Sequence, residues 1–166
     1  LSCEGCEWQD LRERDGARVG ELSQLMDKFP KSEVSLYREL CQLSSSSQMV
    51  YLGNSLPIRL WDLVDAGQVK TYANRGVNGI DGQLSTAMGR VQANTQNWVI
   101  LGDLTTLYDF SAFWASPWIR ETASVNLVVV NNGGGQIFSR LFKSSLFLNS
   151  HDLNFQKMAE FWGWNY

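Results

Sequence analysis

The chain has 166 residues, of which 44% are hydrophobic and only 3 are proline, so it is long enough for one domain with a full core and too short for two. Its 14 basic and 17 acidic side chains give a net charge of -3 without a basic run, which makes nucleic acid and anionic membranes poor partners. No apolar stretch approaches the roughly 20 residues of a membrane span, and the start, "LSCEGCEWQD", lacks both the basic and the apolar part of an export signal, so we expect a cytoplasmic chain.

Residues 1–45 are expected to form a helical lead, in keeping with a linker from a preceding domain, and residues 46–166 an α/β domain. Within the lead, residues 20–29 look helical, and "KSEVSLYRELCQLS" begins a second helix with Ser32 as its N-cap. Cys41 falls on the apolar face of that second helix, which predicts that it packs in the core.

Cys3 and Cys6 form a lone "CEGC" pair, without the second pair of ligands that a structural zinc site needs. Three cysteines are an odd number, which argues against a disulfide framework. We interpret Cys3 and Cys6 as plain thiols, with a metal or redox role as the alternative.

From residue 46 onward, strand patterns alternate with helix patterns over short connections. The strands are expected at 48–54, 69–76, 97–103 and 126–132, and the helices at 55–67, 80–92, 104–115 and 152–164. This order predicts an α/β fold, a doubly wound and mainly parallel sheet with helices on both faces. The valines at 128–130 indicate a buried parallel strand that starts near Asn126 or Leu127. In the last helix, four residues are spaced for burial: Leu153, Met158, Ala159 and Trp162.

Polar and glycine-rich segments follow all four expected strands: "GNS" at 53–55, "NRGVNGIDG" at 74–82, "GDL" at 102–104 and "NNGGGQ" at 131–136. Each alone is an ordinary set of turn and cap residues. In a parallel sheet, however, all four project to the edge at which ligands bind.

Asp103 follows an apolar strand at an exposed strand end and opens a helix whose free N–H groups would attract a phosphate. A carboxylate beside a phosphate needs a bridging cation, and Mg²⁺ binds one or two protein oxygens together with phosphate oxygens. Asn132 offers a second oxygen without adding charge. The glycines around Gly134 would let a main-chain carbonyl turn toward the same metal.

These residues carry a resemblance. "GD" followed by "NN" resembles the thiamine diphosphate and magnesium motif of thiamine-dependent enzymes, although Leu104 stands where most of that superfamily has glycine. Together, "GNSLPIRLWD", "NRGVNGIDGQLSTAMG", "GDLTTLYDF" and "VVVNNGGGQIFSRL" resemble one branch, the menaquinone-pathway synthase family that makes 2-succinyl-5-enolpyruvyl-6-hydroxy-3-cyclohexene-1-carboxylate. The resemblance covers residues 48–163, and four motifs in the right order make it specific.

The resemblance implies two cofactors, thiamine diphosphate and Mg²⁺, and the diphosphate-binding domain of the thiamine diphosphate-binding fold. Asp103, Asn132 and the carbonyl of Gly134 match the metal ligands. The other cofactor positions are matched by Gly102 and Leu104 against the diphosphate, Ile80 under the bent cofactor, and Gln136, Ile137 and Phe138 in the wall over its reacting carbon. Ser55, Arg59 and Arg75 match substrate-binding positions, with Ile137 and Phe138 beside them.

The residues themselves also allow simpler interpretations. Arg59, in an otherwise apolar helix, has the pattern of a surface side chain whose stem lies on apolar groups. Arg75 stands in a turn, where a solvated charge is the default. His151, the only histidine, has no identifiable acid partner and is expected to flank a helix N-terminus.

The resemblance implies decarboxylation of 2-oxoglutarate and addition of the remaining four-carbon unit to isochorismate. The activating glutamate of this family belongs to an upstream pyrimidine-binding domain. We therefore expect no catalytic residue in these 166 residues and no activity of the chain alone. In the whole enzyme we expect a homo-oligomer, such as a homodimer. Two alternatives stay open: another thiamine-dependent decarboxylase or acetolactate-type synthase, and a non-catalytic assembly domain that retains the fold.

Overall fold

A computed structural model describes residues 5–65, 67, 69–74, 79–139, 141–142 and 144–166, apart from the side chains of residues 5–7. The helices are α1 (Gly5–Lys28), α2 (Glu33–Leu43), α3 (Leu56–Val64), α4 (Gln83–Arg90), α5 (Asp103–Tyr108), α6 (Ser116–Arg120) and α7 (Phe155–Phe161). The strands are β1 (Met49–Leu52), β2 (Thr71–Tyr72), β3 (Gln96–Gly102) and β4 (Ser124–Val130). Short 3-10 helices are η1 (Phe110–Ala115), η2 (Gln136–Phe138) and η3 (Ser145–Phe147).

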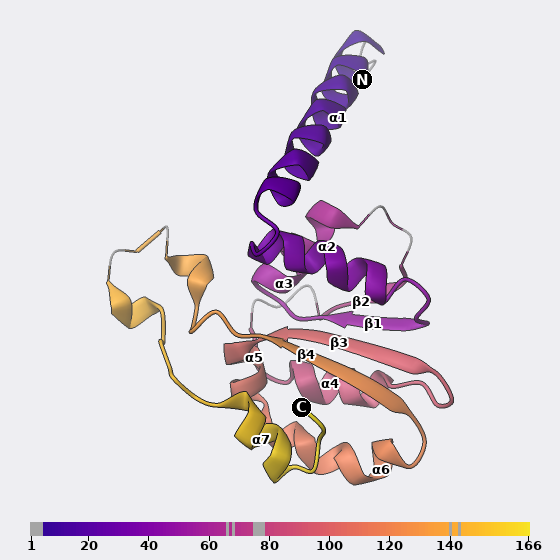
Figure 1. Cartoon of the computed structure of the whole chain (residues 1–166), viewed down its shortest axis with the longest axis vertical. Helices are drawn as coiled ribbons and strands as arrows, with labels where there is room; N and C mark the ends of the chain where they lie inside the picture. Colours follow the sequence, from indigo (N-terminus) through magenta and orange to yellow (C-terminus); the bar gives the residue numbers. More distant parts are fainter. Residues whose placement is uncertain (1–4, 66, 68, 75–78, 140, 143) are drawn as a thin grey trace.

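The strands form one parallel sheet in the order β2-β1-β3-β4. Helices α2 and α3 lie on one face, and α4, α5, α6 and α7 lie on the other (Figure 1). The predicted doubly wound α/β fold is thereby confirmed. Because every strand runs the same way, the carboxyl ends of β1, β3 and β4 meet at one edge of the sheet.

Side chains of β1 and β3 alternate between two apolar cores, as the pleat requires. On one face, Val50 and Ile100 pack with Tyr37 of α2 and Trp61 of α3. On the other face, residues of the two strands pack with Leu84, Ala87 and Met88 of α4 and with Phe113 of η1. Burial of each large apolar side chain stabilises the fold by about 1.5–3 kcal/mol, so the two cores hold the carboxyl edge of the sheet in place.

Helix α1 begins at Gly5, well before the predicted start at residue 20. Its side chains are almost all exposed, and it projects from the body of the protein (Figure 1). Sequence periodicity missed its first half because that half has no continuous apolar face. Pairs four residues apart support it instead, such as Asp10 with Arg14 and Gln9 with Glu13.

The segment predicted as one helix over 104–115 is two elements, because α5 ends at Tyr108 and η1 follows. The break lies at Asp109, whose carboxylate accepts hydrogen bonds from the Ser85 backbone N–H at 2.6 Å and from Ser85 Oγ at 2.8 Å. This carboxylate thus joins α4 to the turn after α5. A helical pattern alone could not reveal a tertiary bond of this kind.

Strand β4 is half-buried rather than fully buried as predicted, and it starts at Ser124. It lies at the edge of the described sheet, so β3 is its only neighbouring strand among the described residues and its other edge is unpaired there. The last helix is also less buried than its spacing predicted. Leu153 precedes α7 and is 46% exposed, while Met158, Ala159 and Trp162 are half-buried.

Cys41 is half-buried against the core of α2 and α3, and its thiol donates to Asp65 Oδ1 at 3.8 Å. Burial raises the pKa of this thiol, and the Asp65 charge raises it further. Cys3 and the side chain of Cys6 lie outside the described part of the chain. Across the described residues, no helix has both the length and the apolar character that crossing a bilayer requires.

Candidate cofactor and metal site

A cleft of about 350 Å³ opens at the carboxyl edge of the sheet. The predicted site residues that the structure describes all line this cleft: Ser55, Arg59, Ile80, Gly102, Asp103, Leu104, Asn132, Gly134, Gln136, Ile137 and Phe138. Arg75 lies outside the described residues. The structure therefore brings together residues from separate strand ends, as parallel topology predicts, while the role of each stays a prediction.

Asp103, the first residue of α5, is buried rather than exposed, with 3% of its surface accessible. Its Oδ1 accepts a hydrogen bond from the Leu104 backbone N–H at 2.7 Å. Its Oδ2 accepts one from the Gly134 backbone N–H at 2.8 Å and lies 3.1 Å from His151 Nε2. The carboxylate thus joins the end of β3 to the glycine segment after β4 and to the loop before α7.

Asn132 enters the cleft from the end of β4. Its Nδ2 donates a hydrogen bond to Glu33 Oε1 at 3.3 Å, across the sheet edge to the first turn of α2. Burial raises the pKa of Glu33, the hydrogen bond from Asn132 lowers it, and the negative charge of Asp103 raises it again. Two carboxylates therefore share this part of the cleft, an arrangement that a bound cation would stabilise.

Close packing of backbone requires glycine at position 134, in the glycine segment after β4. Gly134 has φ 132°, and a Cβ atom there would lie 2.3 Å from the carbonyl oxygen of Leu148. The next residue, Gly135, donates its N–H to that same oxygen. The carbonyl of Gly134, predicted to face the metal, accepts a hydrogen bond from the Gln136 N–H at 2.9 Å, which leaves it one lone pair.

Ser55 precedes α3 rather than beginning it, so the predicted start of this helix at residue 55 is one residue too early. Ser55 and Arg59 both line the cleft. Ser55 has φ 75°, a backbone region that costs about 1–3 kcal/mol for residues other than glycine, and its hydroxyl does not cap the helix. Arg59 is exposed and, among the described residues, forms no ion pair.

Gln83 ties the segment containing Ile80 to the end of β1. Its Oε1 accepts from the Asn54 backbone N–H at 2.7 Å, and its Nε2 donates to the Gly79 carbonyl at 3.0 Å. Asn54 Nδ2 donates to the same carbonyl at 2.8 Å. Gln83 is 1% exposed, so these bonds are shielded from water and hold Ile80 at the cleft.

The oxygen donors of this cleft suit Mg²⁺, which prefers carboxylate and carbonyl oxygens and keeps other positions for phosphate oxygens or water. They are the carboxylates of Asp103 and Glu33, the Asn132 amide oxygen and the Gly134 carbonyl oxygen. Within the described ranges, no three His, Cys, Asp or Glu side chains gather as a metal-binding group. Any all-carboxylate, thiolate or imidazole centre of that kind is therefore absent from these residues.

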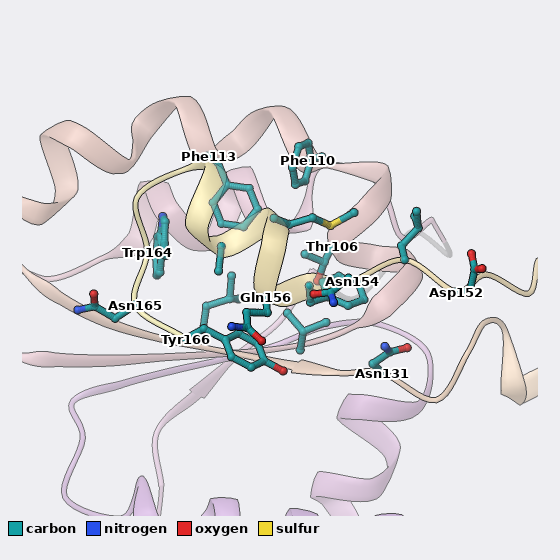
Figure 2. Close-up of a pocket in the computed structure, with 16 residues that line it drawn as sticks. Thr106, Phe110, Phe113, Asn131, Asp152, Asn154, Gln156, Trp164, Asn165 and Tyr166 are labelled. Atoms are coloured by element: carbon teal, nitrogen blue, oxygen red, sulfur yellow. The ribbon is translucent and has the colours of Figure 1, made fainter.

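A second cavity, of about 430 Å³, lies between α7, α5, η1 and β4 (Figure 2). Phe113, Gln156, Trp164 and Tyr166 are among the side chains that line it (Figure 2). None of the predicted cofactor or substrate residues lines it. The cleft and this cavity are therefore separate features of the protein.

A scan against models of protein families gives no match to the chain. Curated proteins do match it, and three of the most similar share one name, 2-succinyl-5-enolpyruvyl-6-hydroxy-3-cyclohexene-1-carboxylate synthase. The protein of that name from Bdellovibrio bacteriovorus is 44% identical over 92% of this chain and 29% of its own length. The one from Akkermansia muciniphila is 34% identical over 94% of this chain and 31% of its own length. The chain is homologous to a segment of these synthases.

A third synthase of this name, from Shewanella frigidimarina, is 33% identical over 86% of the chain and 26% of its own length. The chain thus spans less than a third of the synthases it matches. The resemblance inferred from the four strand-end motifs agrees with the name of all three relatives.

Sequence reasoning did not identify as site residues Glu33 and Tyr37, which line the cleft, or His151, which contacts Asp103. Ser32 and Glu33 indicated only the start of a helix, and Tyr37 only an apolar face. His151 seemed to lack an acid partner because that partner, Asp103, is 48 positions away in the chain. Its position just before the last helix carried no signal of this contact.

Proposed function

We propose that this chain is the part of a thiamine-dependent carboligase that binds Mg²⁺ and the diphosphate of thiamine diphosphate. The whole enzyme decarboxylates 2-oxoglutarate and adds the remaining four-carbon unit to isochorismate, giving the product for which the homologous synthases are named. The observation that carries the proposal is the meeting of Asp103 and Asn132, from the ends of neighbouring strands, in a cleft lined by the other predicted residues that the structure describes.

Asp103, Asn132 and the Gly134 carbonyl would hold the cation, and Gly102 and Leu104 would lie against the diphosphate. Gly102 has no side chain to obstruct an approaching phosphate, and a Cβ atom there would meet only Thr105 Oγ1, at 3.9 Å. Ile80, Ile137 and Phe138 supply apolar surface to the same cleft. When bound, thiamine diphosphate supplies the electron sink for loss of carbon dioxide, and the protein orients it and excludes water.

Arg59 and Ser55 are proposed to bind substrate carboxylates at the mouth of the cleft. Both substrates are polyanions, and a guanidinium without an ion-pair partner in the described chain is suited to bidentate binding of a carboxylate. Ser55 has a strained backbone, and its hydroxyl does not cap α3. Both features favour a binding role over a structural one.

The function is tested with the full-length protein, thiamine diphosphate, Mg²⁺, 2-oxoglutarate and isochorismate. We expect release of carbon dioxide and an adduct with the mass of the named product, and we expect neither when pyruvate replaces 2-oxoglutarate. An adduct formed from pyruvate would support an acetolactate-type synthase instead. Failure to bind thiamine diphosphate with Mg²⁺ would support a non-catalytic assembly domain.

Replacing Arg59 by alanine is expected to lower kcat/KM for one of the two acids by about 10- to 150-fold, because a charge-assisted hydrogen bond contributes about 1.5–3 kcal/mol. Affinity for thiamine diphosphate should stay at the wild-type value. Steady-state kinetics with each substrate varied separately would show which acid the guanidinium binds.

Arg18→Ala, on the exposed surface of α1, is the matched control and should leave both kinetic constants unchanged. Wild-type kinetics for both acids in Arg59→Ala would contradict a substrate-binding role. Arg59 would then be an ordinary surface residue.

A further inference from the structure

Each oxygen of the Asp103 carboxylate has a different set of partners. A carboxylate oxygen has two lone pairs. Oδ2 uses both, one with the Gly134 N–H at 2.8 Å and one with His151 Nε2 at 3.1 Å. Oδ1 uses one, with the Leu104 N–H at 2.7 Å, and therefore keeps a lone pair for a cation.

The hydrogen bonds of His151 determine which of its nitrogens carries the proton. The Leu153 backbone N–H donates to Nδ1 at 3.3 Å, so Nδ1 bears a lone pair and the proton of the neutral ring is on Nε2. Nε2–H then donates to Asp103 Oδ2. The ring is 11% exposed and makes an edge contact with Phe155, so its orientation is well defined.

Asn132 is oriented in a comparable way by Glu33. Its NH₂ group donates to Glu33 Oε1 at 3.3 Å, while its Oδ1 accepts no hydrogen bond from the described part of the chain. Rotating the amide by half a turn would place its oxygen against the Glu33 carboxylate, which is unfavourable. Glu33 is itself anchored at the start of α2, where Ser32 accepts a hydrogen bond from the Ser35 N–H at 3.3 Å.

We propose that Glu33 and His151 are positioning residues that orient Asn132 and Asp103 so that one oxygen of each is left for a divalent cation. This inference rests on the proposed function, because it assumes that the cleft binds a cation. Neither residue belongs to the strand-end motifs. Substitution of a residue that hydrogen-bonds to a metal ligand typically lowers metal affinity by about 10- to 100-fold. A loss of metal affinity of this size is measurable.

The test measures binding of Mn²⁺ to the full-length protein with thiamine diphosphate present, by electron paramagnetic resonance, in four variants. Glu33→Ala and His151→Ala should each weaken Mn²⁺ binding by about 10- to 100-fold. Glu33→Gln and His151→Gln should restore most of the affinity, because glutamine can accept from Asn132 in the first case and donate to Asp103 in the second. Glu39→Ala, on the exposed side of α2, is the matched control and should bind like the wild type.

The outcomes separate this inference from the proposed function. If the wild type binds no Mn²⁺, the proposed function is wrong. If the wild type binds but both alanine variants bind equally well, the positioning role is wrong and the function stands. If Glu33→Gln is as weak as Glu33→Ala while its unfolding temperature is that of the wild type, Glu33 is a direct ligand, and the positioning role is overturned.

Discussion

Asp103→Asn in the full-length protein is expected to weaken binding of thiamine diphosphate by more than about 100-fold, as measured by calorimetry at fixed Mg²⁺. Loss of a residue that only hydrogen-bonds to a metal ligand already costs up to about 100-fold in affinity, and Asp103 is proposed as a ligand itself. The substitution keeps the volume of a side chain that is 3% exposed but removes its charge. Its NH₂ group would also face either the Leu104 N–H or the donors from Gly134 and His151.

The burial of Asp103 adds a second expected effect. At least one donor would lose its acceptor in the variant, and an unsatisfied buried group costs about 1–3 kcal/mol. The free energy of unfolding should fall by that amount. Asp62→Asn, on the exposed side of α3, should change neither property. A folded Asp103→Asn protein with undiminished affinity for the cofactor would contradict the metal assignment.

Gly134→Ala is expected to lower the free energy of unfolding by about 2–6 kcal/mol, since a strained backbone and an overpacked site each cost about 1–3 kcal/mol. The added Cβ atom would lie 2.3 Å from the Leu148 carbonyl oxygen and 3.2 Å from both the Asn149 oxygen and the Ser150 Cα. All three are backbone atoms, so the loop that carries His151 would have to move. Urea unfolding measures the loss, and weaker Mn²⁺ binding should accompany it.

Gly133→Ala separates the two causes of that loss. Gly133 also has a positive φ, 81°, but a Cβ atom there would meet nothing within 4 Å. This variant should show the backbone strain alone, about 1–3 kcal/mol. Equal destabilisation by the two substitutions would mean that contact with the Leu148 segment does not limit residue 134.

The sequence was sufficient to predict the fold class and the meeting of the strand-end residues in one cleft. Alternation of short apolar runs with helical patterns identified a parallel sheet, and a parallel sheet places all strand ends at one edge. Asp103 and Asn132 could therefore be paired from their positions after β3 and β4. The physical basis lies in short segments: side-chain alternation follows from the period of each strand, and a helix between two strands returns the chain so that both run the same way.

Contacts between distant segments were decided only by the tertiary structure. Glu33 meets Asn132 from 99 positions away, and His151 meets Asp103 from 48. The edge position of β4, the burial of Asp103 and the break at Asp109 likewise depend on which elements pack beside them in the folded protein. Local patterns determine which residues a strand end presents. The partners that orient those residues come from separate elements, whose approach is set by how α2, the glycine segment and the loop before α7 pack against the sheet.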